Sequence, residues 1–372
     1  MTALNHKGRQ GAGPTGPTGQ KPAPPLRMLF WESTARCNLA CVHCRRLDVA
    51  EAAAKDDLTT EEFRRVLDSA ATLGGPVVVF SGGEPLLRDD WETLAAHAAS
   101  LRLPTALATN GTLIDDALAG RIAAAEFRRV SVSLDGPDAA SHDAFRGVGG
   151  AFEAALAGIA ALRRRDVPVQ INATIAAHNA ARLDELHDLA RSVGAVALHL
   201  FLLVPVGCGV RIAETHQLAP AAYERVLNWL LDRQQGGGTP GGGAVLELKA
   251  TCAPHYYRLA AQRGLDVGRS RGCLCGVSVV FVSHSGEVFP CGYLPVHCGS
   301  VRRRALADIW RGSEVFAALR DYDRLGGKCG RCEFGGVCGG CRARAYALTG
   351  DYLAAEPACT HRPAPGAAQS PA

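Results

Sequence analysis

Three cysteines near the beginning of the chain are the residues whose type and spacing most clearly point to chemistry. Cys37, Cys41 and Cys44 are separated by three and then two residues, so one tight loop can present all three sulfurs to a single centre. A cubane iron–sulfur cluster has four irons, and each of them needs an outer ligand. Three thiolates therefore leave one iron open for a ligand that is not protein.

Zinc and a disulfide fit these cysteines less well. A zinc site needs a fourth Cys or His nearby, and His43, the immediate neighbour of Cys44, would strain a tetrahedron. An odd number of cysteines at this spacing does not suit disulfides either. The pattern therefore favours an iron–sulfur cluster.

The spacing C-x3-C-x2-C, directly after the apolar run Met28–Trp31, resembles the signature of the radical S-adenosylmethionine (radical SAM) enzymes. This resemblance implies a catalytic 4Fe-4S cluster on Cys37, Cys41 and Cys44, whose open iron binds S-adenosyl-L-methionine. It further implies that the reduced cluster cleaves the cofactor to a 5′-deoxyadenosyl radical. An electron donor such as flavodoxin or ferredoxin is implied as well.

Polar motifs at the ends of later predicted strands resemble the family's cofactor site. Ser81-Gly82-Gly83-Glu84-Pro85 on its own is typical of a turn, with glycines that leave backbone groups open to a ligand. Behind the cysteine motif it resembles the family segment that binds the methionyl amino group. The resemblance implies these cofactor-binding residues: His43, Gly82, Gly83, Glu84, Asn110, Ser133 and Arg146.

Each of these residues also has an ordinary interpretation. Asn110 and Ser133, expected on the nucleoside side, lie in Asn-Gly and Asp-Gly segments that form turns readily. Arg146 resembles an arginine that binds the cofactor carboxylate, but it could equally be a solvated helix residue. His43 is expected to pack on adenine or to lie free on the rim.

A second set of cysteines follows in the C-terminal third of the chain. The paired C-x2-C spacing alone is typical of a zinc ribbon. Behind a radical SAM motif the set resembles the SPASM extension, which holds one or two auxiliary 4Fe-4S clusters, although its last pair is separated by two residues and not by the usual three. The metal ligands implied are Cys273, Cys291, Cys329, Cys332, Cys338, Cys341 and Cys359.

The resemblance divides these ligands into two groups. Cys273, Cys291 and Cys341 would hold an inner cluster, and the remaining four an outer one. The fourth inner ligand stays open between Cys275, Cys298 and the substrate. Cys208 and Cys252 are interpreted as ordinary thiols.

Short strands alternate with helical stretches before the second cysteine set. Thr59 and Glu62 predict a capping box for the first helix, and Gly74 its end. Such βα units predict an α/β fold, a partial (β/α)6 TIM-like barrel with function at the carboxyl ends of its strands. The predicted strands are Met28–Trp31, Val77–Ser81, Thr105–Thr109, Arg129–Leu134, Val169–Thr174 and Val196–Leu203.

Composition suggests the domain boundaries. Residues 1–25 and 363–372 are predicted to be disordered tails, 26–235 the barrel, 236–243 a Gly-rich linker and 244–362 the Cys-rich SPASM-type domain. Within the last, Val277–Val282 and Val288–Phe289 predict a hairpin that brings Cys291 beside Cys273.

Bulk properties exclude several function classes. The chain has 372 residues and a net charge of +4, which does not call for nucleic acid as a partner. It contains no apolar run of membrane-spanning length and no signal peptide. Fourteen cysteines without a secretory signal predict a cytoplasmic metalloprotein.

Four central segments resemble the AdoMet-dependent haem synthases: 199–205, 249–257, 290–293 and 338–344. This implies a small-molecule substrate, iron-coproporphyrin III, whose two propionates are oxidatively decarboxylated to vinyls to give protohaem. An auxiliary cluster would accept the surplus electrons. The pocket walls are expected from 200–204, Tyr256 and Tyr257, an axial iron contact from His255, and carboxylate clamps from Arg342 or Arg344; each could instead be core or surface.

Two other readings remain. A SPASM peptide maturase, or an enzyme of haem d1 synthesis, would share every cluster motif, although no leader-binding domain is expected in the short N-terminal segment. A non-catalytic zinc or iron–sulfur electron-transfer protein would share the cysteines but not the cleavage of S-adenosyl-L-methionine.

Overall fold

A computed structural model describes residues 23–46, 51–236, 245–266 and 272–364. Ten strands form one sheet in the order β10-β9-β8-β1-β2-β3-β4-β5-β6-β7. The strands are β1 Met28–Glu32, β2 Val77–Ser81, β3 Thr105–Thr109, β4 Val130–Ser133, β5 Val169–Ile175, β6 Ala197–Leu202, β7 Glu247–Thr251, β8 Val279–Val282, β9 Glu287–Phe289 and β10 Gly299–Ser300. The tails and the linker expected from composition lie largely outside the described residues.

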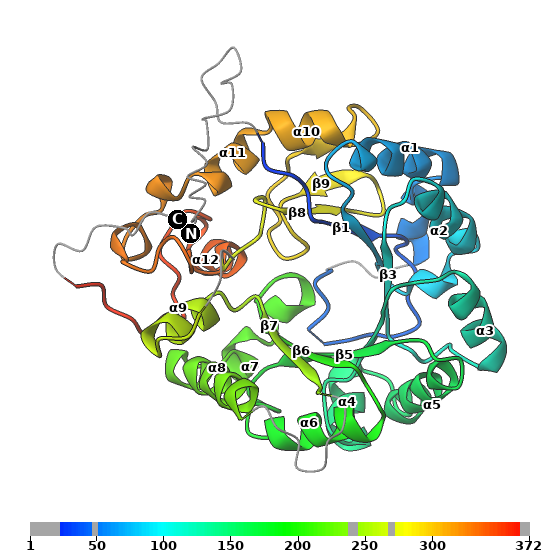
Figure 1. The fold of residues 1–372 in the computed structure, drawn as a ribbon, viewed down its shortest axis with the longest axis horizontal. Coiled ribbons are helices and arrows are strands. Elements are labelled where there is room, and N and C mark those ends of the chain that lie inside the picture. Colours follow the sequence, from blue (N-terminus) through cyan, green and yellow to red (C-terminus); the bar gives the residue numbers. More distant parts are fainter. Residues whose placement is uncertain (1–22, 47–50, 237–244, 267–271, 365–372) are drawn as a thin grey trace, which may run out of the picture.

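The six predicted strands are confirmed as β1–β6, each within one residue at either end. Every neighbouring pair from β1 to β7 is parallel, as βα units require. The sheet curves into an incomplete ring with the helices outside it (Figure 1). The predicted α/β partial barrel is therefore confirmed.

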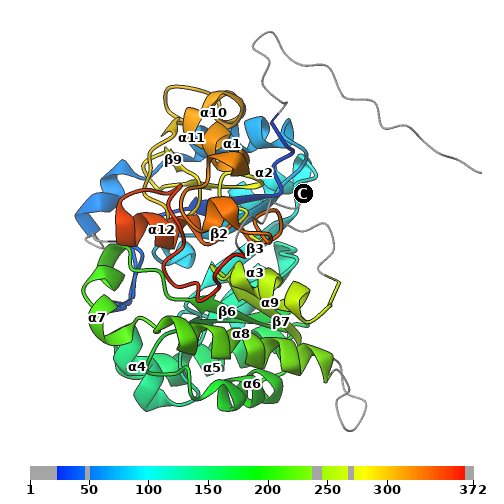
Figure 2. The ribbon, with the colours of Figure 1, turned by 90° about the vertical axis from the view of Figure 1, so that its left-hand side faces the viewer.

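Segments from beyond residue 244 lengthen this sheet at both ends. β7 pairs in parallel with β6, and β8 pairs in parallel with β1. The predicted hairpin is present, since β8 and β9 are antiparallel. The remaining C-terminal helices, α10 to α12, lie together on one side of the barrel (Figure 2).

Helices connect and cover the strands. They are α1 Thr60–Ala71, α2 Trp91–Ser100, α3 Asp116–Ala124, α4 Ala139–Arg146, α5 Ala151–Arg163, α6 Leu183–Ser192, α7 Ala213–His216, α8 Pro220–Gln235, α9 His255–Gln262, α10 Leu306–Gly312, α11 Glu314–Arg320 and α12 Arg342–Thr349. Short 3-10 helices are η1 Glu51–Asp56, η2 Pro85–Leu87, η3 Gly207–Val210, η4 Tyr322–Arg324 and η5 Cys329–Arg331. Among the described residues no single helix is long and apolar enough to cross a bilayer; the sharply bent pair α4–α5 meets that test by length and composition alone.

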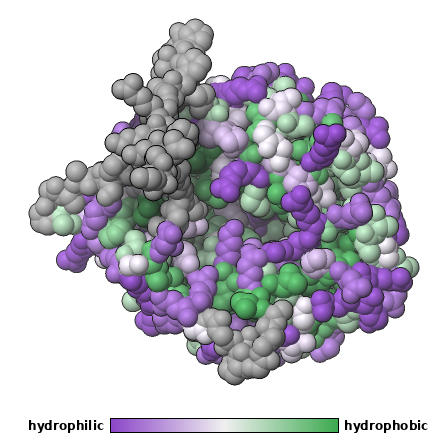
Figure 3. Space-filling view, viewed as in Figure 1, coloured by the Kyte–Doolittle hydropathy of each residue, from purple (hydrophilic) through white to green (hydrophobic). Residues whose placement is uncertain are grey.

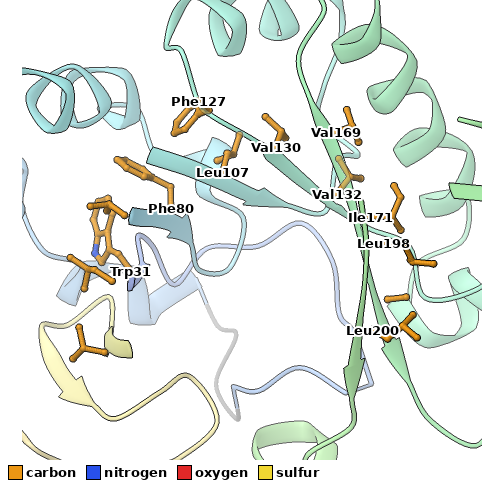
Figure 4. Close-up of a cluster of buried hydrophobic side chains, with 14 of the residues drawn as sticks. Trp31, Phe80, Leu107, Phe127, Val130, Val132, Val169, Ile171, Leu198 and Leu200 are labelled. Carbon is orange, nitrogen blue, oxygen red and sulfur yellow. The ribbon is translucent and has the colours of Figure 1, made fainter. Parts of the chain in front are cut away.

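The core fills the layer between the sheet and the helices (Figure 4). In α1 the predicted capping box is present, and the helix turns Phe63, Val66, Leu67 and Ala70 inward. The Phe63 ring stacks on Trp31 of β1 with ring centroids 3.4 Å apart. On one face, the middle of the molecule is hollowed and bordered by hydrophilic residues (Figure 3).

Candidate iron–sulfur and cofactor site

The cysteine loop leaves the carboxyl end of β1 and is held by buried polar contacts. Glu32, the last residue of β1, pairs with Arg45 at 3.0 Å. Arg46 donates to the Ala35 carbonyl at 2.8 Å, and the Asp57 carboxylate accepts from the backbone N–H of Ala35 at 3.0 Å. Both ends of the loop are therefore fixed to the rim of the barrel.

Cys37, Cys41 and Cys44 lie close enough together for each charged sulfur to disfavour the charge of another. Burial raises the pKa of Cys37 to about 11 and also raises the pKa of Cys41. Buried thiols of this kind stay protonated unless a cation compensates their charge, as metal coordination does. Arg146 Nη1 donates to Cys41 Sγ at 3.7 Å. The donor set fits a metal cluster with one iron left to another ligand.

Gly82 and Gly83 pack against the backbone of the cysteine loop. A Cβ on Gly83 would lie 2.0 Å from the Arg36 carbonyl oxygen, so only glycine fits there. The Gly83 and Glu84 N–H groups donate to carbonyls of the loop, those of Thr34 at 2.9 Å and Arg36 at 2.7 Å. The glycines therefore bring the end of β2 into contact with the cysteines.

Glu84 is fully buried beneath the loop. Its carboxylate accepts hydrogen bonds from Thr109 Oγ1 and from the Asn110 N–H, each at 2.8 Å. Burial raises the pKa of Glu84 to about 7 despite these bonds. The Asn110 side chain donates to Asn38 of the cysteine loop at 2.8 Å. The ends of β2 and β3 are thus both hydrogen-bonded to the loop that leaves β1.

Asp135 carries a second buried charge beside the cysteines. Arg146 Nη2 lies 2.6 Å from Asp135 Oδ2, and His43 Nε2 lies 3.5 Å from the same oxygen. Burial is the largest influence and opposes ionisation of Asp135, but the Arg146 guanidinium, the neighbouring histidines and the Thr174 N–H together outweigh it and hold the pKa of the carboxyl below its usual range. The predicted site residue Arg146 is therefore placed at the cysteine loop, with Asp135 as its partner.

His43 stacks on Phe145 with ring centroids 4.2 Å apart. Burial lowers the pKa of His43 to about 4, so its ring is neutral near pH 7. Ser133 lies half-buried at the end of β4, two residues before Asp135. From the sequence, Asp135 is assigned only to a turn; the signal that could have found it is a carboxylate directly after a buried strand.

The inner cysteines gather where α12 and the β8–β9 hairpin meet. Cys275 lies against both Cys273 and Cys291, and Cys252 lies against Cys341. Cys298 lies apart from this group, and its thiol donates to the Val296 carbonyl at 3.5 Å. Cys275 and Cys252 are therefore the thiols placed to complete an inner cluster.

Cys252 was interpreted from the sequence as an ordinary thiol, and its place among the inner cysteines is a finding of the structure. Its backbone is left-handed, with φ of 56°, which is uncommon for a residue with a side chain. The Cys252 carbonyl accepts from Tyr223 Oη at 2.8 Å and from Arg344 Nη2 at 3.1 Å. This strained conformation directs the end of β7 toward Cys341.

The outer cysteines line a separate, partly open cavity; they are Cys329, Cys332, Cys338 and Cys359. Cys329 Sγ accepts from the Glu356 N–H at 3.3 Å and from Arg342 Nη2 at 3.9 Å. Both donors point at the sulfur, and the four thiols fit a second auxiliary cluster.

Two expectations about the substrate pocket are wrong, namely the arginine clamps and the axial histidine. The proposed clamps Arg342 and Arg344 are only 3% and 1% exposed. Their guanidinium groups donate to backbone carbonyls, and Arg344 also pairs with Glu356. His255 is 0% exposed and lines the outer cysteine cavity, so it is not open to a porphyrin iron. Tyr256 and Tyr257 line a pocket between α8, β7 and α9.

Comparison with known proteins agrees with this arrangement. Residues 31–193 match the radical SAM superfamily, and residues 273–333 match an iron–sulfur cluster-binding domain, SPASM. The chain is 45% identical to an AdoMet-dependent heme synthase of Methanosarcina barkeri over 91% of this chain and 97% of that protein. It is 43% identical to one of Nitratidesulfovibrio vulgaris, over 95% and 98% of the two chains.

Solved structures agree on the fold. The crystal structure of Streptococcus suis SuiB bound to S-adenosylmethionine superposes with a TM-score of 0.72 at 17% identity, covering 91% of this chain and 78% of that one. The chain uses 4Fe-4S clusters and S-adenosyl-L-methionine as its cofactors. The arrangement of cysteines and these similarities together place the chain in the radical SAM superfamily, in the SPASM-containing family of the AdoMet-dependent haem synthases.

Proposed function

We propose that this protein converts iron-coproporphyrin III to protohaem by oxidatively decarboxylating two propionates to vinyl groups. The observation that carries the proposal is the loop of three half-buried thiols joined to the ends of β2 and β3, followed by two further thiol groups in the same chain. The high identity to proteins named AdoMet-dependent heme synthase supports the porphyrin substrate.

We assign the catalytic cluster to Cys37, Cys41 and Cys44, and the cofactor site to the residues around them. When bound, the cluster and S-adenosyl-L-methionine supply a 5′-deoxyadenosyl radical that takes a hydrogen atom from the substrate. Arg146 and Asp135 hold a fixed pair of charges beside Cys41, and Glu84 is an acceptor at the end of β2. Their burial excludes water, which would otherwise quench a reactive intermediate.

Each propionate loses one hydrogen atom, one further electron and carbon dioxide as it becomes a vinyl group. The surplus electron needs an acceptor, and the inner and outer thiol groups are places where this chain can hold one. We further propose a reducing cytoplasm as the site of action, which suits so many free thiols, and a small flavin or iron–sulfur protein as electron donor.

The test is anaerobic incubation with S-adenosyl-L-methionine, a reductant and iron-coproporphyrin III, followed by mass spectrometry. The expected result is two successive losses, each of carbon dioxide with two hydrogen atoms, accompanied by 5′-deoxyadenosine. Cys41→Ala should abolish both products. Cys298→Ala, which removes a thiol lying apart from the cysteine groups, should retain them.

Two outcomes would contradict the proposal. Release of 5′-deoxyadenosine only when a peptide is added would indicate a peptide-modifying enzyme. Zinc in place of iron and sulfide in the anaerobically purified protein would exclude the radical reaction altogether.

A further inference from the structure

The outer cysteine cavity contains a histidine whose ring nitrogens have no hydrogen-bond partner among the described residues. His255 is the first residue of α9, and its side chain lines the same cavity as the four outer cysteines. The ring is 0% exposed, and neither Nδ1 nor Nε2 has a hydrogen-bond partner in the structure. A buried polar group without a partner is costly, so such a group usually marks a missing ligand or ion.

The surroundings explain which partner the ring lacks. The Tyr223 ring packs edge-on against His255 with centroids 4.9 Å apart, while the Tyr223 hydroxyl donates to the Cys252 carbonyl. The tyrosine therefore fixes the position of the ring and leaves both nitrogens free. The four outer cysteine sulfurs line the same cavity as His255. A metal cluster bound by these sulfurs would therefore bring hydrogen-bond acceptors into the cavity beside the ring.

An imidazole ring carries at least one N–H donor in either of its protonation states. The cavity already directs donors at sulfur, since Cys329 accepts from two N–H groups.

We propose that His255 donates its ring N–H to a sulfur of the iron–sulfur cluster held by the outer cysteines, and thereby raises the reduction potential of that cluster. The inference rests on the outer cluster assigned above. Adding an electron makes the cluster more negative, so a donor to its sulfur stabilises the reduced form more than the oxidised form. The proton stays on nitrogen throughout; only one electron is gained or lost by the cluster.

The experiment is a potentiometric titration of the full-length, anaerobically purified protein, followed by EPR. The EPR signal that is missing from the Cys338→Ala protein is assigned to the outer cluster. His255→Phe keeps a ring but has no donor, and should shift the midpoint potential of that signal alone to a more negative value at unchanged iron content. His255→Gln retains an N–H donor, so its midpoint potential should lie between those of His255→Phe and the unaltered protein.

His97→Phe is the matched control, because His97 lies on α2 and pairs with Asp68 at the surface. It should leave every potential unchanged. An unaltered potential in His255→Phe at full iron content would overturn the proposal. Loss of the outer cluster in both His255→Phe and His255→Gln would also overturn it, because the imidazole would then be an iron ligand.

The inference can fail without the proposed function failing. If Cys338→Ala loses no iron relative to the unaltered protein, the outer cluster does not exist and the role of His255 falls. Decarboxylation dependent on Cys41 would be unaffected by that result.

Discussion

Replacing Asp135 by Asn tests whether the buried charge pair beside the cysteine loop holds the rim of the barrel together. The amide oxygen can still accept from the Thr174 N–H, which lies 2.6 Å from Asp135 Oδ1. What disappears is the negative charge 2.6 Å from Arg146 and 3.5 Å from His43. Arg146 would then be a buried cation that keeps its contact with Cys41 but has lost its paired carboxylate.

The size of the effect follows from this burial. Asp135 is 0% exposed, and removing one partner of a buried ion pair costs about 3–5 kcal/mol, because the other charge remains desolvated. Because Asn keeps the backbone hydrogen bond, we expect the lower end, about 3 kcal/mol. At ~1.4 kcal/mol for each factor of ten, the ratio of folded to unfolded protein falls about 100-fold.

Anaerobic unfolding in denaturant, followed by tryptophan fluorescence, measures this free energy. Asp138→Asn is the matched control: Asp138 caps α4 and pairs with Arg182 at the surface, and Asn is an equally good cap. The control should lose less than about 1 kcal/mol. Equal free energies of unfolding for the two variants would refute the view that the Asp135–Arg146 pair is structural.

Three further predictions concern single contacts. The pKa of Glu84 is raised from 4.5 to about 7, so between these pH values the folded state binds more protons than the unfolded state. The free energy of unfolding should therefore fall by about 3 kcal/mol as pH rises from 4.5 to 7, and Glu84→Gln should flatten this decline. Phe63→Ala, which removes the ring stacked on the β1 tryptophan, should cost about 3–5 kcal/mol in thermal unfolding, whereas exposed Arg65→Ala on the same helix should change little. Gly83→Ala places a Cβ 2.0 Å from a carbonyl of the cysteine loop and should lower the iron content by one cluster, whereas Gly149→Ala, whose Cβ meets nothing within 4 Å, should not.

The strands of the barrel were predictable because their signals are local. Apolar runs such as Val77–Ser81 and Thr105–Thr109 are bounded by turn residues, and the Thr59–Glu62 capping box fixes the start of α1 within one chain segment. The arrangement of β7 and β8 at opposite ends of the sheet was not predictable in this way. Their places depend on pairing between residues far apart in the chain, such as Ala197 with Glu247 and Met28 with Val279, and the periodicity of a single segment does not show which strand it will pair with.

The site shows the same division. Cysteine spacing indicates a cluster, because ligands within one loop must be near each other. Whether a polar residue is buried depends on what packs over it, and that is set by distant segments. From the sequence, Arg344 is interpreted as a cation available to a substrate, but in the structure it donates to the carbonyls of Leu202, Leu203 and Cys252. Cys252 is interpreted as an ordinary thiol, and only the position of β7 in the sheet places it against Cys341.

The pairing of β8 with β1 has a consequence for the way the enzyme can be shortened or recombined. A version that ended before the second cysteine set would leave β1 without its outer neighbour along Met28–Trp31, and exposed strand edges recruit other chains. The auxiliary-cluster region therefore cannot be moved between proteins as an independent domain. Transferring it to another barrel would also require the β1 edge with which β8 pairs.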